Sequence, residues 1–215
     1  LQFKLNPEMA NSERVRAQNV SQSIVLLSQG IPFLQMGGDF LRSKSLDRNT
    51  YDAGDWYNRV DFTFDMNNWN KGLPLDKGGR TETELVSLAS SPASTVAMMY
   101  ILFASNVFNE FLSIRSNSSL FRLTTATDII DRVGFHNIGK NQTQGLIVMS
   151  IDDGTSLTDI DPNYDAMVVL VNGSNSEQTH TIPTASDFSL HPLLMDSVDG
   201  TVASATFAQG NDEGS

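Results

Sequence analysis

The sequence predicts an α/β region followed by an all-β region, and three observations lead to this fold class. Apolar residues recur at helical spacing over residues 12–29 and again over 94–115, which indicates two amphipathic helices. A short apolar run at residues 31–36 follows the first helix, as a buried strand would. Beyond Leu120 the pattern changes to short β-type runs. This change places the boundary between the two regions near residue 118.

The first helix and the run after it have recognisable ends. Ser12 is a candidate N-cap, and Gly30 is a candidate C-terminal stop. Between them the apolar positions are Val15, Val20, Ile24 and Leu27. The run 31–36 is closed by Gly37-Gly38 and is too short for a helix. A helix followed by a buried strand suggests an α/β barrel or a layered sheet.

Residues 39–80 predict a long loop, because Asp, Asn, Arg, Gly and aromatic residues are mixed there without a sustained period. Loops of this length are usually functional. The second helix is expected after Pro92, where apolar residues step by three or four. These residues are Val96, Met99, Phe103, Val107, Phe111 and Ile114.

The all-β region is predicted from three runs, at residues 131–136, 145–150 and 166–171. Each is rich in β-branched or other apolar residues and is bounded by Gly, Asn, Asp or Pro. These short runs with turn residues between them indicate a module of short strands.

Composition excludes several classes of partner. The 25 acidic and 14 basic residues give a net charge of -11, which opposes binding to nucleic acid. No apolar stretch reaches the roughly 20 residues that a membrane helix needs, and no signal peptide is visible. Without cysteine there is no disulfide and no thiolate ligand. The compartment stays open on these grounds.

Residues 42–59 concentrate charged, amide and aromatic side chains. Carboxylates and guanidinium groups can hydrogen-bond to sugar hydroxyls, while aromatic faces can cover the apolar side of a pyranose. The alternative is a polar loop held together by its own ion pairs. Composition alone leaves both interpretations open.

A series of motifs resembles the pullulanase-type debranching enzymes, pullulanase and limit dextrinase. The motifs are Gly30-Ile31-Pro32-Phe33, Leu41-Arg42-Ser43-Lys44-Ser45, Tyr51-Asp52-Ala53-Gly54-Asp55-Trp56-Tyr57-Asn58-Arg59-Val60-Asp61, Asn67-Asn68-Trp69 and Gly72-Leu73-Pro74. The similarity continues through residues 119–123, 132–137 and 145–153, so it spans nearly the whole chain.

The resemblance implies a fold and an activity. Residues 1–118 would be the C-terminal end of an α-amylase-type (β/α)8 barrel, and residues 119–215 an antiparallel β-sandwich. Residues 12–29 would be the seventh barrel helix, 31–36 the eighth strand and 94–115 the last helix. The family hydrolyses α-1,6-glucosidic branch linkages of starch, glycogen or pullulan by a retaining mechanism. Its catalytic groups are an Asp nucleophile, a Glu acid/base and a second Asp.

The resemblance places those three catalytic residues upstream of Leu1, so we assign no catalytic residue and expect this fragment alone to be inactive. It assigns substrate binding to Asp55 and Arg59, which would hold the glucose next to the cleaved residue on the non-reducing side. Trp56 is expected to pack and to support the loop. Structural salt bridges are expected for Arg42 and Lys44. No role in catalysis is expected for His136, His180 and His191, which fall in the β-region.

The expected partners are a branched α-glucan (pullulan, limit dextrin, amylopectin or glycogen) and the rest of the barrel. No cofactor is expected in this fragment, although calcium is possible in a full-length enzyme. Five acidic residues could suggest calcium ligands, but a solvated loop is favoured because the EF-hand spacing is missing. These are Asp152, Asp153, Asp159, Asp161 and Asp165.

Two further questions stay open at the level of sequence. The location would be extracellular or at the cell surface for a bacterial protein, and the plastid for a plant or algal one. The alternative function is a non-catalytic carbohydrate-binding or accessory β-module formed by residues 120–215. The loop at 42–59 argues against that alternative, because a free-standing module has no need of it.

Overall fold

The computed structural model describes residues 9–154, 156–182, 187–208 and 213–214. The chain divides into two compact units. One contains the described residues up to Asn19 together with Leu34–Asn106, and the other contains Val20–Phe33 together with the described residues from Val107 onward. The division at residue 118 that the sequence suggests stays a prediction.

The first unit consists of helical segments around a long irregular stretch. Its elements are the first part of α1 (Asn11–Leu27), the short 3-10 helices η1 (Asp55–Asn58) and η2 (Pro92–Ser94), α2 (Glu82–Ser90) and the first part of α3 (Met98–Asn117). The two long helices and the loop between them are therefore confirmed. Helix α2 was not expected from periodicity. It begins at a capping box, in which Thr81 Oγ1 accepts from Glu84 N and Glu84 Oε2 accepts from Thr81 N.

The strand predicted at residues 31–36 is wrong for this structure. The segment is irregular, and the side chains of Ile31 and Phe33 are 95% and 94% exposed. A strand needs a neighbour for its ladder hydrogen bonds, and none of the described strands pairs with this segment. Gly30, by contrast, ends α1 as expected, with a φ of 87° in the left-handed region.

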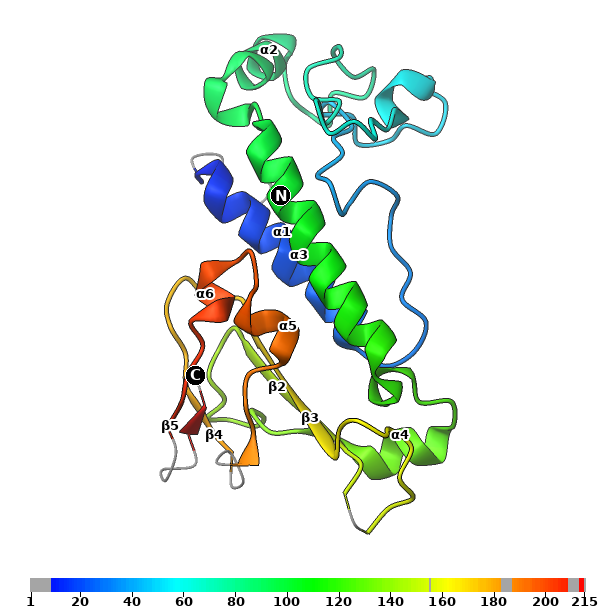
Figure 1. Ribbon diagram of the computed structural model, residues 1–215. Coiled ribbons are helices and arrows are strands. Elements are labelled where there is room, and N and C mark those ends of the chain that lie inside the picture. Colours follow the sequence, from blue (N-terminus) through cyan, green and yellow to red (C-terminus); the bar gives the residue numbers. More distant parts are fainter. Residues whose placement is uncertain (1–8, 155, 183–186, 209–212, 215) are drawn as a thin grey trace. The chain divides into compact units, whose positions relative to one another are not determined.

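The second unit is built on an antiparallel sheet of order β1-β2-β3, from β1 (Val133–Phe135), β2 (Leu146–Asp152) and β3 (Ala166–Asn172). Strands β2 and β3 lie side by side (Figure 1), with Met149 opposite Val169. A smaller sheet has the order β4-β6-β5, from β4 (His180–Thr181), β6 (Glu213–Gly214) and β5 (Phe207–Ala208).

Helical segments precede β1 and separate β4 from β5 along the chain. They are η3 (Ser119–Arg122), α4 (Ala126–Arg132), α5 (Pro192–Met195) and α6 (Gly200–Ala203). The predicted β-runs at 145–150 and 166–171 are confirmed. The run at 131–136 is confirmed only over β1, because its first two residues complete α4 and His136 lies beyond the strand. The second unit is thus antiparallel sheet plus helices, and the described residues do not establish a β-sandwich or a closed barrel.

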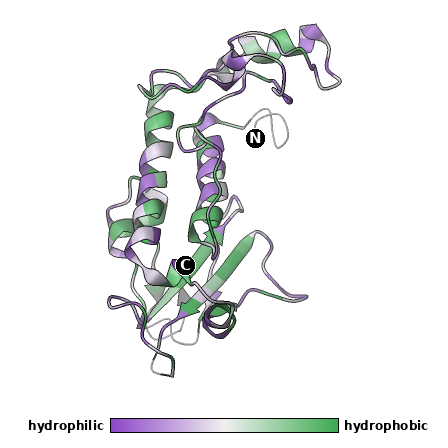
Figure 2. Ribbon diagram, turned by 90° about the vertical axis from the view of Figure 1, so that its right-hand side faces the viewer, coloured by the Kyte–Doolittle hydropathy of each residue, from purple (hydrophilic) through white to green (hydrophobic). Residues whose placement is uncertain are grey.

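Strand β2 is the centre of the hydrophobic core in the second unit. Met149 and Ile151 on one face join a cluster with Leu27, Ile114, Leu120, Phe121 and Met167. Leu146 and Val148 on the other face join Ile182. Side chains alternate along a strand, so β2 contributes residues to a separate cluster on each face of the sheet. The hydropathy colouring shows β2 and β3 as mostly apolar ribbons (Figure 2).

One stretch, Pro92–Asn117, is long and apolar enough to cross a membrane by length and composition alone. A core helix of a soluble protein passes the same test. On this stretch Ile101, Ala104 and Val107 are almost completely buried, whereas Met98, Met99, Leu102 and Leu112 are exposed. A single stretch of this kind is weak evidence for a membrane span.

Arg115 on α3 completes the C-terminal end of α1. Its guanidinium is buried, and Nη1 donates to the carbonyls of Leu26 and Ser28 at 2.7 Å each, while Nη2 donates to that of Gly30 at 2.5 Å. The last carbonyls of a helix have no partner within the helix. One side chain from another helix therefore satisfies three acceptors at the point where the chain leaves α1.

The variant Arg115→Met is expected to lower the free energy of unfolding by about 2 to 4 kcal/mol, because it leaves buried carbonyls without donors. Urea unfolding followed by circular dichroism measures this change. Lys140→Met on the surface is the control and should stay within about 0.5 kcal/mol of the parent. Equal effects of the two substitutions would contradict this role of Arg115.

His191 joins α5 to the loop before β3. Its Nδ1 accepts from Leu193 N at 3.2 Å, and its Nε2 lies 3.1 Å from the hydroxyl of Tyr164. An Nδ1 that accepts a hydrogen bond carries no proton, so this arrangement requires the neutral ring. Burial lowers the pKa of His191 from its ordinary value, which also favours the neutral form.

His191 is therefore expected to make folding stability depend on pH. Because the pKa of His191 is lower in the folded than in the unfolded chain, its contribution to folding stability is fully present above the unfolded value of about 6.5. That contribution is lost as the pH falls through the folded pKa. Thermal unfolding of the parent and of His191→Asn between pH 7.5 and 5 tests this. The difference between the two should shrink as the pH falls, and a constant difference would rule it out.

Candidate functional site

The site loop, residues 38–80, has almost no regular structure and carries unusual backbone geometry. Six non-glycine residues among those described have a positive φ, and all of them lie in this loop: Leu41, Ser45, Leu46, Phe64, Asn68 and Asn70. Such conformations are unfavourable for most residues and gather at functional sites. These backbone conformations make the site loop the candidate functional region of the chain.

Side chains hold the site loop in place by pairing with its main chain. Ser45 is 1% exposed; its Oγ accepts from Lys71 N at 2.7 Å and donates to the carbonyl of Gly72 at 3.3 Å. Asn67 Nδ2 donates to the carbonyl of Leu41 at 3.0 Å. Asn68 donates to three carbonyls, those of Ser43, Trp56 and Tyr57. In a sheet, neighbouring strands pair the main-chain donors and acceptors; in the site loop, side chains supply these partners.

The predicted binding residues lie at the two ends of the short helix η1: Asp55 is its first residue and Arg59 is its C-cap. Gly54 precedes it with a φ of 97°, which only glycine adopts readily. Both Asp55 and Arg59 are exposed, whereas Tyr57 between them is 1% exposed. The Tyr57 hydroxyl donates to the carbonyl of Leu73. The pKa of Tyr57 is raised, mainly by burial and to a smaller extent by the charge of Asp47. The phenol therefore keeps its proton and remains a donor.

Trp56 packs against the site loop, as expected. Its ring stacks on that of Tyr57 with centroids 3.6 Å apart, and 42% of the residue stays exposed. Gly72 lies against the other part of the indole, where a Cβ atom would overlap Trp56 Cη2. The two adjacent rings stack within η1 and leave part of an aromatic surface open to solvent.

The salt bridges expected for Arg42 and Lys44 are not present among the described residues. Arg42 Nη1 instead donates to the carbonyl and the Oδ1 of Asn58, at 3.3 and 3.2 Å. Lys44 Nζ donates to Thr50 Oγ1 at 3.0 Å. Both cations thereby tie the motif at 41–45 to the segment around η1, through neutral partners rather than carboxylates.

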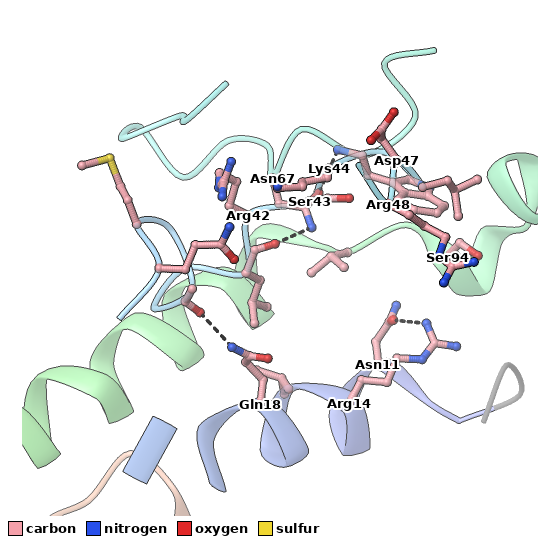
Figure 3. A pocket seen from close by; sticks show the side chains of 18 of the residues that line it. Asn11, Arg14, Gln18, Arg42, Ser43, Lys44, Asp47, Arg48, Asn67 and Ser94 are labelled. Atoms are coloured by element: carbon pink, nitrogen blue, oxygen red, sulfur yellow. Dashed lines mark hydrogen bonds between the residues drawn. The ribbon is translucent and has the colours of Figure 1, made fainter. Parts of the chain in front are cut away.

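A pocket of about 690 Å³ lies in the first unit, between α1 and the site loop. Figure 3 shows Asn11, Arg14 and Gln18 of α1 on one side, with Arg42, Lys44 and Arg48 of the site loop on the other. Arg80 and Asp47 are the remaining charged residues that line it. Neither Asp55 nor Arg59 is among the described lining residues. The pocket and the predicted binding pair are therefore separate parts of the loop.

The exposed surface near η1 carries carboxylate and guanidinium groups that can form hydrogen bonds. Among the described residues, the Asp55 carboxylate makes no hydrogen bond or ion pair and is open to a ligand. Hydrogen bonds from Thr63 and Met66, with a smaller effect of the Arg59 charge, lower the pKa of Asp61, which stays ionised. These groups can form hydrogen bonds with hydroxyls.

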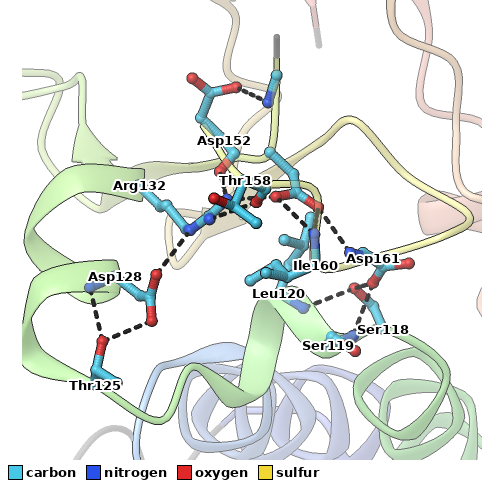
Figure 4. Close-up of polar contacts among 12 residues, drawn as sticks. Ser118, Ser119, Leu120, Thr125, Asp128, Arg132, Asp152, Thr158, Ile160 and Asp161 are labelled. Carbon is cyan, nitrogen blue, oxygen red and sulfur yellow. Dashed lines mark hydrogen bonds and ion pairs between the residues drawn. The ribbon is translucent and has the colours of Figure 1, made fainter. Parts of the chain in front are cut away.

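The acidic run after β2 is not a solvated loop throughout, which corrects the sequence interpretation for Asp153 and Asp161. Both are buried, at 5% and 4% exposure. Asp153 pairs with Arg132 and accepts from Asp161 N at 2.7 Å, while Asp161 accepts from Ser118 Oγ at 2.6 Å. Figure 4 shows these contacts joining α4, the loop and η3.

Burial by itself would raise the pKa of Asp161, but hydrogen bonds from Ser118, Asn163 and Ser119 outweigh it and lower the pKa. Its ionised oxygens are therefore occupied by protein donors. Among the described residues, no group of three or more His, Cys, Asp or Glu could hold a metal ion. The network has a structural role in the second unit.

Comparison with known proteins establishes the family. Residues 64–214 match the family described as alpha-1,6-glucosidases, pullulanase-type, C-terminal. The chain therefore belongs to the pullulanase-type α-1,6-glucosidases, and the resemblance carried by the motifs is confirmed.

Individual relatives agree with this assignment. The chain is 39% identical over 214 residues to pullulanase 1, chloroplastic, of Arabidopsis thaliana, covering 96% of this chain and 22% of the relative. It is 32% identical over 211 residues to the pullulanase of Klebsiella pneumoniae, covering 98% of this chain and 19% of the relative. The chain thus spans about a fifth of the length of these relatives.

Solved structures share the fold of the chain. The crystal structure of a maltotriose complex of PulA from Klebsiella pneumoniae matches with a TM-score of 0.85 and 30% identity, over 99% of this chain and 23% of that one. The apo pullulanase from the same organism matches with a TM-score of 0.83 and 31% identity, over 99% and 23%. A pullulanase complexed with maltotetraose from Anoxybacillus, 19% identical, shares the fold with a TM-score of 0.56, over 84% and 20%.

The substitution Gly72→Ala is expected to destabilise the site loop by about 1 to 3 kcal/mol, because the new methyl group overlaps Trp56 in addition to straining a φ of 144°. Gly79→Ala is the matched control. Gly79 also has a positive φ, but nothing lies within 4 Å of the position that its new methyl group would take. Chemical unfolding should show the larger loss for Gly72→Ala, and equal losses would contradict the packing role of Trp56.

Proposed function

We propose that this chain is part of a debranching enzyme that hydrolyses α-1,6-glucosidic branch linkages in starch, glycogen or pullulan. The retaining mechanism of the resembling family needs an Asp nucleophile, a Glu acid/base and a second Asp. In this proposal all three are supplied from outside the 215 residues. Residues 1–118 then complete a (β/α)8 barrel, and residues 119–215 form its C-terminal β-sandwich.

The observation that supports this proposal best is the rigid, exposed presentation of Asp55 and Arg59. The main-chain carbonyls of the residues between them accept hydrogen bonds from Asn68 and Arg42, whereas the two charged residues are exposed to solvent. A preorganised site loses less conformational entropy on binding than a flexible loop does. This arrangement suits a binding surface better than a loop closed by its own ion pairs.

The chemistry of the pair suits a glucosyl residue. A carboxylate at Asp55 accepts hydrogen bonds from two neighbouring hydroxyls, and the guanidinium of Arg59 donates to ring or hydroxyl oxygens. The exposed part of the Trp56 ring offers an apolar face for the C–H side of a sugar. Related structures contain maltotriose or maltotetraose, which are α-glucan fragments. The proposed role is to position the glucan, with bond cleavage carried out elsewhere.

The proposed substrates are branched α-glucans: pullulan, limit dextrin, amylopectin or glycogen. Calcium could bind elsewhere in a full-length enzyme. The exposure of Ile31 and Phe33 agrees with residues 31–36 pairing with further barrel strands, because these apolar side chains find no cover among the described residues.

The substitutions Asp55→Asn and Arg59→Gln in the complete gene product are each expected to weaken maltotriose binding by about 10- to 100-fold, because each removes a charged hydrogen-bonding partner. Isothermal titration calorimetry measures the affinity, and release of reducing ends from pullulan measures the activity.

Asp65→Asn and Lys71→Gln are matched controls, since both residues are exposed in the same site loop. They should stay within about twofold of the parent, as surface changes away from a site usually do. Unchanged affinity in both Asp55→Asn and Arg59→Gln would overturn the proposed role of this pair.

A further inference from the structure

We propose that Asn68 is a positioning residue that holds the turn carrying Asp55 and Arg59 in its binding geometry. The proposal rests on the function proposed above and extends it to a residue that does not face the ligand. Asn68 is 2% exposed, so it acts through the main chain of η1 and not by touching the glucan.

The contacts of Asn68 converge on η1. Its Nδ2 donates to the carbonyl of Trp56 at 2.9 Å and, more weakly, to that of Tyr57 at 3.4 Å. The same nitrogen lies 3.3 Å from the carbonyl of Ser43. An amide nitrogen has two hydrogens, so the three acceptors share them. One side chain thereby joins η1 to the motif at 41–45.

These carbonyls belong to residues that the helix itself leaves without partners. The helix η1 has only four residues, and the carbonyls near the end of a helix find no donor inside it. Without Asn68, the Trp56 and Tyr57 carbonyls would lose a buried donor. A different orientation of this turn would move Asp55 at its start and Arg59 at its end together.

The backbone at Asn68 explains why asparagine suits this position. Its φ is 66°, in the left-handed region that asparagine adopts more readily than other non-glycine residues. Glycine would keep this backbone but remove the amide, and aspartate would keep the size but replace the donor by acceptors. The two substitutions therefore separate the hydrogen bonds from the backbone conformation.

The neighbouring Asn67 is a matched control. It is also buried, at 8% exposure, but its side chain pairs with Leu41 O and Trp69 N and, among the described residues, makes no hydrogen bond to η1. Replacing Asn67 therefore removes a buried amide from the same loop without releasing the turn. A purely structural role of Asn68 would make the two residues equivalent.

The experiment compares Asn68→Gly and Asn67→Ala in the complete gene product, with maltotriose as the probe in calorimetry. Both variants are expected to lower the melting temperature. Asn68→Gly should weaken maltotriose binding by about tenfold, the scale of a buried hydrogen bond lost, and Asn67→Ala by less than about twofold. If Asn68→Gly does not fold, Asn68→Asp takes its place.

A double-mutant comparison with Asp55→Asn distinguishes a positioning role from a general one. If Asn68 acts through the turn, Asn68→Gly should weaken binding less in the Asp55→Asn background than in the parent, because only Arg59 is then left to be displaced. The same tenfold loss in both backgrounds would overturn the proposal. The proposal would also be overturned if Asn68→Gly bound maltotriose normally while Asp55→Asn bound it poorly. Normal binding by Asp55→Asn and Arg59→Gln would instead overturn the proposed binding role of that pair.

Discussion

Buried main-chain donors and acceptors need partners, and in the site loop many of these partners are side chains of the loop itself, beside main-chain pairs such as Ser43 N to Asn67 O. Asn68 supplies donors to three carbonyls, and Ser45 bridges two further main-chain groups. Without such contacts, a segment of this length that lacks strands would have no reason to prefer one conformation. The positive φ angles along the loop are kept because these hydrogen bonds outweigh their strain.

In the second unit, charged side chains supply the hydrogen-bond partners that buried main-chain groups need. Arg115 satisfies the carbonyls at the end of α1, and Asp161 accepts the donors at the start of η3. A buried charge stabilises a fold only when its hydrogen bonds are complete. Asp153 fulfils that condition through Arg132 and the main chain of Ile160 and Asp161. Carboxylates that resemble a metal site in the sequence are therefore occupied by the protein itself.

In the site loop, buried residues support the main chain and exposed residues are available to a ligand, which relates the fold to the proposed function. Residues that satisfy the main chain are buried, and those proposed to meet the glucan are exposed beside them. Asp55 and Arg59 lie at the two ends of a turn whose other residues are held from several sides. A binding surface of this kind needs rigid support more than it needs regular secondary structure. Membership in the pullulanase-type family fits such a loop as part of a larger site.

The sequence by itself determined the two long helices, the strands β2 and β3, the long loop and the family. Helix periodicity and strand composition are local properties, and the motifs of the site loop are specific enough to identify relatives. It also singled out Asp55 and Arg59, whose role remains a proposal.

Only the tertiary structure decided which polar residues are buried and which backbone groups they satisfy. The strand expected at 31–36 needs a neighbour to form, and no local pattern shows whether one is present. The burial of Asp153 and the contacts of Asn68 likewise join residues far apart in the chain. A run of Asp residues or an Asn-Asn pair reads the same in sequence whether it faces solvent or the interior, because burial is a property of the packed chain.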